Sequence, residues 1–280
     1  MMETYPFAGA RDDKSPYVVI GIPLDFTGTY KPGTRFAPDK IREAGANIEF
    51  YSLITKRTIE HIGFNDLGNI VLPPGEVDKS LEIVEKVVKS LVNDFTDKII
   101  ISLGGEHTIT LPVVKALSKR IDTLVVFDAH LDLRDEYLGS RLNHSTFLRR
   151  LLETVDINVV HIGSRALSAD EVRYLTSEKR VKAIDVLDYR RVNEIDSTGK
   201  VYISIDMDVL DPSYAPGVGN PEPLGMTPLQ LLEALKHIVE VSESVVSFDI
   251  VEVNPMVDVN NVTSLLAAKL VWEMAGLLGR

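Results

Sequence analysis

Cysteine is absent from this chain of 280 residues. Its absence excludes disulfides, iron–sulfur clusters, cysteine-rich zinc sites and thiol nucleophiles. The sequence also lacks any run of about 18 apolar residues, the length that crosses a bilayer. No basic stretch followed by an apolar one, the mark of a signal peptide, stands at the N-terminus. We therefore expect a cytoplasmic protein that does not associate with a membrane.

Basic residues are in the minority, with 30 Lys and Arg against 41 Asp and Glu, a net charge of −11. This balance argues against a nucleic-acid-binding protein, which normally presents a basic surface. It favours the approach of cationic small molecules, as a weak bias that salt screens. Hydrophobic content of 45% is ordinary for a soluble globular protein. No Gly/Ser/Pro-rich linker interrupts the chain, so residues 1–280 are expected to form one domain.

Short apolar runs alternate with helical patterns along the whole chain, which predicts an α/β fold with a parallel sheet. Most of the runs are continuously apolar, as in strands that are buried on both faces. Helix starts are indicated by capping boxes at Ser168 and Thr227, and the last helix is expected over 261–278. The eight predicted strands are Tyr17–Ile22, Ile59–Phe64, Lys98–Leu103, Leu124–Asp128, Ile157–Ile162, Val181–Ile184, Val201–Asp206 and Val245–Val251.

Aspartates and histidines follow three of these predicted strands, where ligand sites of parallel sheets lie. Buried carboxylates need a compensating partner, and divalent cations provide one. Residues at i, i+2 and i+4 of an extended segment point to the same side. Oxygen-rich ligands with some imidazole suit Mn²⁺, and tolerate Mg²⁺ or Co²⁺. The candidate metal ligands are His107, Asp128, His130, Asp132, Asp206 and Asp208.

The four aspartates offset the charge of two divalent ions, and a bridging hydroxide leaves the cluster near −1. Such a site favours a cationic substrate. Glu252 directly follows the last predicted strand, where its carboxylate can bind a cation or form a salt bridge or a loop hydrogen bond. His144 follows an irregular polar loop and can act as a general acid/base or proton shuttle. His61 and His161 lie in strand-like runs and are expected in the core or an interface, whereas His237 is expected to be solvated.

Together these motifs resemble the ureohydrolases, the arginase and agmatinase family, over nearly the whole chain. The resemblance implies a three-layer α/β/α domain around an eight-stranded, mainly parallel sheet, and a homo-oligomer, either trimer or hexamer. It also implies two Mn²⁺ ions per chain, with Asp128 and Asp206 bridging them. The motifs are Gly21-Ile-Pro-Leu-Asp25, Pro32-Gly-Thr-Arg35, Gly104-Gly-Glu-His107, Asp128-Ala-His-Leu-Asp132, Ser204-Ile-Asp206-Met-Asp208-Val-Leu-Asp-Pro212 and Asp249-Ile-Val-Glu252-Val-Asn-Pro255.

The chemistry implied by the resemblance is hydrolysis of a guanidino group to urea and an amine. Two cations lower the pKa of a bridging water, and the hydroxide attacks the planar guanidinium carbon. Asp128 would take the proton and relay it to the leaving amine, and His144 would exchange protons with bulk water. Glu252 would orient the guanidinium by charge-assisted hydrogen bonds. A different metal-dependent hydrolase, such as a deacylase, is a second hypothesis, and Glu252 with the full ligand set counts against it. A catalytically silent binding or structural homologue is a third, and the intact ligands count against it.

The substrate is predicted from the loop 133–143. In arginases the corresponding loop contains Asn and Ser residues that bind the α-amino acid end of the substrate, and this sequence does not match it. Agmatine has no carboxylate, so this mismatch favours hydrolysis of agmatine to putrescine and urea. Arg134, Ser140 and Arg141 keep arginine, guanidinobutyrate, another guanidino acid and formimino-glutamate open as alternatives. Two motifs depart from many relatives: Glu106 stands where they have Asp, and His144 has different neighbours.

Overall fold

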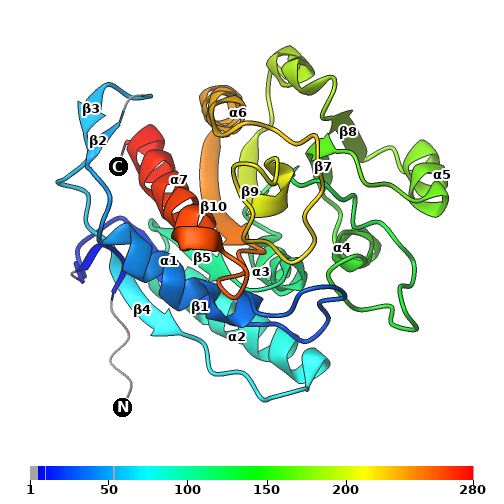
Figure 1. The fold of residues 1–280 in the computed structure, drawn as a ribbon, viewed down its shortest axis with the longest axis horizontal. Helices are drawn as coiled ribbons and strands as arrows, with labels where there is room; N and C mark the ends of the chain where they lie inside the picture. The colour runs from blue at the N-terminus through cyan, green and yellow to red at the C-terminus, as the bar shows by residue number, and fades with distance from the viewer. Residues whose placement is uncertain (1–5, 10, 53, 280) are drawn as a thin grey trace.

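The central element is an eight-stranded sheet in which every pairing is parallel. The computed structural model describes residues 6–9, 11–52 and 54–279. The strand order is β4-β1-β5-β10-β9-β6-β7-β8 (Figure 1). The bounds are β1 Tyr17–Ile22, β4 Asn65–Asn69, β5 Ile99–Gly104, β6 Thr123–Phe127, β7 Asn158–Ser164, β8 Val181–Asp185, β9 Lys200–Asp206 and β10 Ser244–Val251. A short antiparallel hairpin, β2 Tyr51–Ser52 and β3 Arg57–Thr58, lies outside this sheet.

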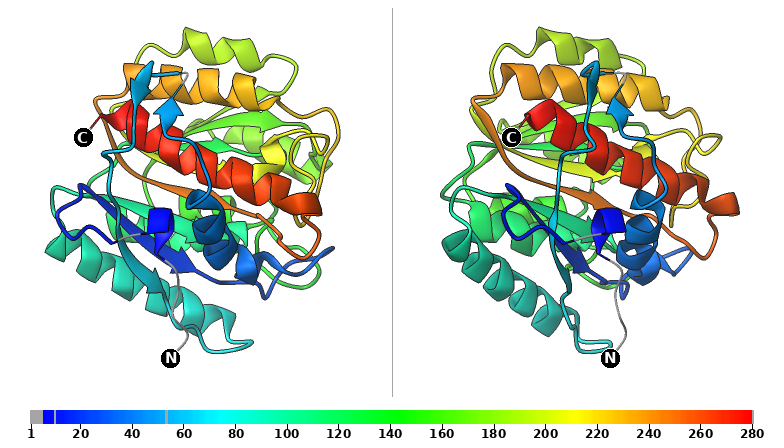
Figure 2. Two further views of the ribbon diagram at one scale, coloured as in Figure 1. Left: turned by 60° about the vertical axis from the view of Figure 1, so that its left-hand side comes forward. Right: turned by 90° about the vertical axis from the view of Figure 1, so that its left-hand side faces the viewer.

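Helices cover both faces of the sheet, each over its own hydrophobic core. One core includes side chains of α1 Ala37–Gly45, α6 Pro228–Val241 and α7 Val262–Leu278. The other includes side chains of α2 Val77–Asp94, α3 Thr110–Leu117 and α4 Phe147–Thr154, and α5 Ala169–Ser177 packs against it. The turned views show α6 and α7 together on one side, with α2 apart from them (Figure 2). The predicted three-layer α/β/α arrangement is thus confirmed.

Seven of the eight predicted strands are confirmed to within two residues at each end. The exception is the run 59–64, where the strand prediction is wrong because β4 begins only at Asn65. Ile59, Ile62 and Phe64 are buried, but the chain turns there, so their burial comes from core packing rather than strand pairing. β4 is an edge strand that pairs with β1 alone, which explains how a polar segment serves as a strand.

Local signals at two helix starts are confirmed. Ser168 and Thr227 each form a capping box with the residue three positions later, and Pro228 occupies the first turn of α6. Each box satisfies backbone N–H groups that the first helical turn leaves unpaired. Within the described residues, no helix is long and apolar enough to cross a membrane.

Candidate metal centre

Three neighbouring turns at the carboxyl ends of β5, β6 and β9 carry the six candidate ligands. β5 leads into a short 3₁₀ helix, His107–Ile109, and β9 leads into another, Met207–Val209. β6 leads into an irregular segment, 128–132. Because β5, β10, β9 and β6 are adjacent, these turns meet at the middle of one sheet edge. The structure therefore brings together all six residues that the sequence singles out.

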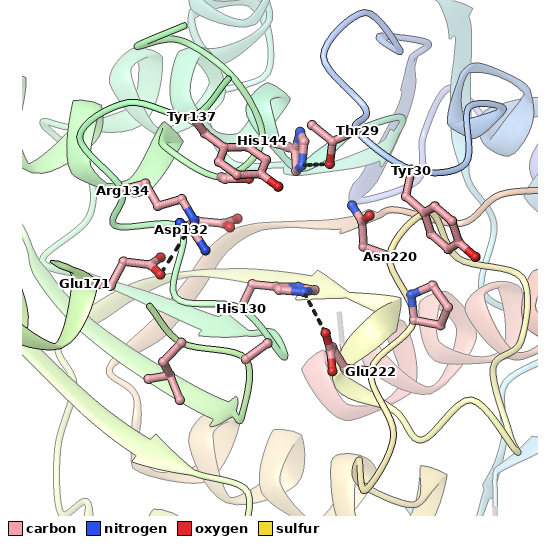
Figure 3. A pocket seen from close by; sticks show the side chains of 14 residues that line it. Thr29, Tyr30, His130, Asp132, Arg134, Tyr137, His144, Glu171, Asn220 and Glu222 are labelled. Atoms are coloured by element: carbon pink, nitrogen blue, oxygen red, sulfur yellow. Dashed lines mark hydrogen bonds and ion pairs between the residues drawn. The ribbon is translucent and has the colours of Figure 1, made fainter. Parts of the chain in front are cut away.

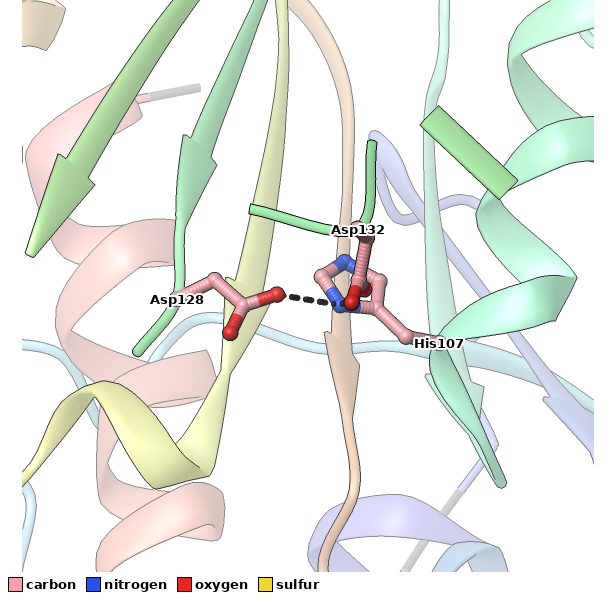
Figure 4. Close-up of side chains that lie close together, drawn as sticks. All are labelled: His107, Asp128 and Asp132. Carbon is pink, nitrogen blue, oxygen red and sulfur yellow. Dashed lines mark ion pairs between the residues drawn. The ribbon is translucent and has the colours of Figure 1, made fainter. Parts of the chain in front are cut away.

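We call the part of this cluster around His107 the inner end. His107 Nδ1 lies 2.9 Å from Asp128 Oδ2, 3.2 Å from Asp206 Oδ2 and 3.4 Å from Asp132 Oδ2. All four side chains are buried. Figure 4 shows Asp128 and Asp132 approaching the imidazole of His107 from different directions. One imidazole nitrogen and carboxylates within 4.8 Å of one another form a set of atoms that can hold one cation.

The outer end is the part around His130. His130 Nδ1 lies 2.9 Å from Asp208 Oδ2 and 3.5 Å from Asp128 Oδ1. The His130 side chain is 28% exposed, in contrast to the buried His107. Asp128 belongs to both ends, with one oxygen facing each histidine, as expected of a carboxylate between two ions.

The electrostatics of the cluster fit a cation site. His107 Nδ1 and Asp128 Oδ2 are fully buried, and beyond the ion pairs of this imidazole neither atom has a hydrogen-bond partner, which is costly unless a cation binds them. Burial alone would lower the pKa of His107, but the adjacent carboxylates of Asp128 and Asp132 raise that pKa to about 9. Burial and the charge of Asp208 raise the pKa of Asp206 well above its usual range. The cluster therefore holds an excess of negative charge that attracts positive ions.

A network of hydroxyls behind His107 orients its ring. Ser204 Oγ lies 2.9 Å from His107 Nε2 and donates to Asp249 Oδ1 at 2.6 Å. Tyr202 and Thr110 donate to the other oxygen of Asp249. Because the proton of Ser204 goes to Asp249, Ser204 accepts from Nε2–H of His107. The Nδ1 lone pair is thereby turned toward the carboxylates, as a metal ligand requires.

Asp132 and Glu252 adopt left-handed backbone conformations, with φ of 52° and 63°. Aspartate tolerates this region better than most residues, whereas glutamate rarely adopts it, so Glu252 is the more strained of the two, and such strain concentrates at functional sites. Glu252 is buried, and its Oε1 accepts from the backbone N–H of His107 at 2.8 Å. A Cβ at Gly219 would lie 3.1 Å from Oε2 of Glu252, so the glycine keeps that oxygen accessible.

A cavity of about 500 Å³ adjoins the cluster and is lined by His130, Asp132 and His144 (Figure 3). His144 comes from the loop that precedes α4. Burial lowers its pKa. Two threonine hydroxyls contact its ring: Thr27 Oγ1 lies 3.4 Å from Nδ1, and Thr29 Oγ1 lies 3.4 Å from Nε2. His144 is therefore held between the loop after β1 and the cavity.

The remaining histidines divide as follows. His161 on β7 is buried as expected, although neither ring nitrogen has a hydrogen-bond partner. His61 does not lie in the core, because it is on an exposed turn between buried apolar residues, and its place in an interface stays a prediction. His237 on α6 is half-buried, and its Nε2 lies 3.0 Å from the carbonyl oxygen of Ile195.

Several residues around the site were missed by reasoning from the sequence. Arg165 bonds the backbone carbonyls of Asp208, Leu210 and Glu222, and so ties the outer end to the following loop. Thr27 and Thr29 reach His144 from more than 100 residues away in the chain. These residues belong to ordinary loop sequence, and only the folded arrangement brings them to the site.

Comparisons with known proteins agree with this architecture. The sequence model described as "Arginase family" matches residues 15–276. An agmatinase from Bacillus cereus is 37% identical over 272 residues, which cover 95% of this chain and 92% of that protein. The N(1)-aminopropylagmatine ureohydrolase from Thermococcus kodakarensis is 34% identical, with 98% of this chain and 94% of that protein covered.

Among solved structures, the agmatine ureohydrolase of Thermoplasma volcanium superimposes with a TM-score of 0.85 at 35% identity. The match covers 99% of this chain and 94% of that one.

Proposed function

The chain belongs to the arginase family of hydrolases, and from this we propose that it is an agmatinase that uses two Mn²⁺ ions to convert agmatine to putrescine and urea. The observation that carries the proposal is the charge of the site. Four buried aspartates and Glu252 surround the place where the guanidino group must react. The four aspartates offset the two divalent ions, and a hydroxide together with Glu252 leaves the site net negative, which favours a cationic substrate.

His107, Asp128, Asp132 and Asp206 would hold one ion at the inner end. Asp128, His130, Asp206 and Asp208 would hold the other at the outer end. A ligand set of carboxylate oxygens with one imidazole per ion is better suited to Mn²⁺ than to Zn²⁺ in a tetrahedral structural site. When bound, two such cations lower the pKa of a shared water and supply hydroxide near neutral pH.

The surrounding residues would position the guanidinium and move its protons. Glu252 has one oxygen occupied by the His107 N–H, so its other oxygen is the one that accepts from the substrate. Asp128 would receive a proton and return it to the leaving amine. His144, at the cavity wall, would exchange protons with solvent. The amine can leave as a neutral molecule only after it has received this proton, because an amide anion is a very poor leaving group.

The charges that line the cavity support a substrate with a second positive charge. Among the described residues that line it, Arg134 is the one lysine or arginine. Its Nε lies 3.8 Å from Glu171, and its guanidinium lies over the ring of Tyr137. Glu222 also lines the cavity, and its carboxylate is 40% exposed. An ammonium group would find Glu222 accessible, whereas a carboxylate would have to compete with Glu171 for Arg134.

The same chemistry on another substrate is the alternative. Arginine, guanidinobutyrate, another guanidino acid and formimino-glutamate each carry a carboxylate, for which Arg134 is the nearest partner. Ser140 and Arg141 do not line this cavity, and Arg141 pairs with Asp135 instead. Release of Arg134 from Glu171 would be needed before these compounds bind well.

The test is urea release by Mn²⁺-loaded protein from agmatine, arginine, guanidinobutyrate and formimino-glutamate, measured side by side, with formamide measured for the last. We expect the highest kcat/KM with agmatine. An Asp128→Asn sample purified in parallel controls for contaminating ureohydrolases. Faster turnover of a carboxylate-ended compound would transfer the proposal to that substrate, and no urea from any guanidino compound with both ions bound would refute it.

A further inference from the structure

A buried carboxylate ties the loop after β1 to the turn that carries His107. Glu106 is 1% exposed and receives four hydrogen bonds. Oε2 accepts from the backbone N–H groups of Phe26 and Thr27, each at 2.8 Å. Oε1 accepts from the hydroxyls of Thr27 at 2.7 Å and Thr108 at 2.8 Å. With all four positions used by donors, the carboxylate acts only as an acceptor.

The hydroxyl of Thr27 has one proton, and Glu106 receives it. Its oxygen can therefore only accept from its remaining partners. Two of them are on His144: the backbone N–H lies at 3.1 Å and ring Nδ1 at 3.4 Å. The third, Thr108 Oγ1, lies 3.5 Å away but gives its own proton to Glu106, so it does not donate to Thr27. An acceptor at Nδ1 requires a proton on Nδ1. The other ring nitrogen, Nε2, is then without a proton when the imidazole is neutral, and Thr29 Oγ1 lies 3.4 Å from it.

We propose that Thr27, held by Glu106, is a positioning residue that fixes His144 in the Nδ1–H tautomer and leaves Nε2, which lies beside Thr29 of the cavity wall, as the proton-accepting nitrogen. Burial lowers the pKa of His144, which favours the neutral imidazole for which this choice matters. The two threonines approach opposite nitrogens, so the ring plane is fixed as well as the proton. The catalytic consequence rests on the proposed function, whereas the tautomer is a property of the protein itself.

The arrangement resembles the one behind His107, where Asp249 takes the proton of Ser204 and leaves Nδ1 free. In both cases a buried carboxylate fixes a hydroxyl, and the hydroxyl fixes an imidazole. The free nitrogen is opposite in the two residues. His107 presents Nδ1 to the carboxylate cluster, and His144 presents Nε2 to Thr29 of the cavity wall.

The test combines nitrogen chemical shifts of histidine labelled with ¹⁵N, with Mg²⁺ added because it is diamagnetic, and steady-state kinetics with Mn²⁺. A His144→Asn sample assigns the signal. Thr27→Val keeps the shape and removes the hydroxyl, Thr27→Ser keeps the hydroxyl, and Thr108→Val removes a hydrogen bond to the same oxygen of Glu106 without touching His144. Melting temperatures and bound metal are recorded for each variant.

We expect the wild type, Thr27→Ser and Thr108→Val to show the Nδ1–H signature, and Thr27→Val to lose it. For agmatine, kcat of Thr27→Val should fall roughly tenfold with KM changed less than about twofold, since an acid–base group contributes roughly 10²–10⁴-fold and only part is lost. Thr27→Ser should restore kcat to within about twofold.

An unchanged Nδ1–H signature in Thr27→Val would overturn the inference, as would an equal fall of kcat in Thr108→Val. A wild-type protein that releases no urea would instead refute the proposed function. The nitrogen shifts would still decide whether Thr27 sets the tautomer, so the two failures can be told apart.

Discussion

The two ends of the metal cluster share Asp128 but are built differently. At the inner end His107 is buried, and Ser204 and Asp249 fix its ring from behind. At the outer end His130 is partly exposed, and the carboxylate facing its Nε2 is Glu222, at 3.9 Å and itself 40% exposed. A rigid, buried ligand loses less entropy on binding and feels a lower dielectric. We therefore expect the inner end to bind its ion more tightly than the outer end.

Asp128→Asn should have the largest effect, because it removes one of the two carboxylates assigned to both ions and the one that contacts both histidines. Each ion supplies several kcal/mol of charge stabilisation in the transition state. We expect binding at both ends to weaken and kcat for agmatine to fall by roughly 1000-fold or more. Elemental analysis and a urea assay measure the two quantities. Two tightly bound ions with activity near wild type would show that Asp128 does not join the ends.

Asp208→Ala and His107→Ala separate the ends. Of the two histidines, Asp208 pairs with His130 at the outer end, so its loss should leave one ion per chain and a small fraction of the activity. His107→Ala should weaken the inner ion and leave the buried carboxylates without their imidazole. Isothermal titration with Mn²⁺ gives the stoichiometry and affinity of each variant. Full activity with two ions bound in Asp208→Ala would contradict the assignment of the outer end.

Removal of the metal should make the stability of the protein depend on pH. In the chelated protein, burial raises the pKa of Glu252 to about 8, and the carboxylates around His107 raise its pKa to about 9 against burial. The folded state binds these protons more tightly than the unfolded state, and the resulting stabilisation is complete at pH values below the ordinary pKa, 4.5 for Glu252 and 6.5 for His107. That stabilisation is lost as pH rises through the raised values. The melting temperature of chelated protein should therefore fall between about pH 5 and pH 9.

The control for this pH series is the Mn²⁺-loaded protein, in which the ions replace the protons as countercharge and the decline should be smaller. Metal binding should also release protons into weak buffer, because the ligands bind as deprotonated groups. A melting temperature that rises with pH in the chelated protein would contradict the raised pKa values of Glu252 and His107.

Ser204→Ala should act at the inner end alone. It removes the acceptor of His107 Nε2–H and one donor to Asp249. Loss of such a supporting hydrogen bond weakens metal binding by roughly 10–100-fold. Titration with Mn²⁺ should show the tighter of two affinities reduced and the weaker one unchanged. An equal loss at both ends would mean that the hydroxyl stabilises the sheet rather than the ligand.

Glu222→Gln should have the smallest effect on the metals, within about twofold, because 3.9 Å is too long for a hydrogen bond to His130. Its effect on substrate is the sharper readout. A half-exposed ion pair is worth about 0.2–1 kcal/mol, so KM for agmatine should rise up to about fivefold. KM for guanidinobutyrate should stay the same or fall. A weakened outer ion would instead assign Glu222 to the metal.

The parts of the molecule that the sequence predicts well are those governed by local pattern. Continuous apolar runs locate seven strands, because a strand buried on both faces must be apolar along its length. β4 escapes this rule, since its edge position allows Asn65, Asp66 and Asn69 to serve as strand residues. The six candidate ligands follow strand ends directly, so the parallel topology alone is sufficient to bring them together.

The parts that the sequence does not predict depend on how loops fold back. Thr27 and Glu106 meet across 79 residues, and Arg165 reaches Asp208 across 43. No spacing rule relates such positions, because each lies in a turn whose path is fixed by the packing of other elements. The inequality of the two ends is likewise invisible in the motifs, which offer one histidine to each.

The most direct test is to titrate metal-free protein with Mn²⁺ and to follow bound ions per chain and urea release from agmatine in the same samples. We predict two binding steps of unequal affinity, with Asp208→Ala losing the weaker one. Urea release should stay near zero up to one ion per chain and rise as the second binds. Full urea release at one ion per chain, or none at two, would contradict a mechanism that needs both ends of the cluster.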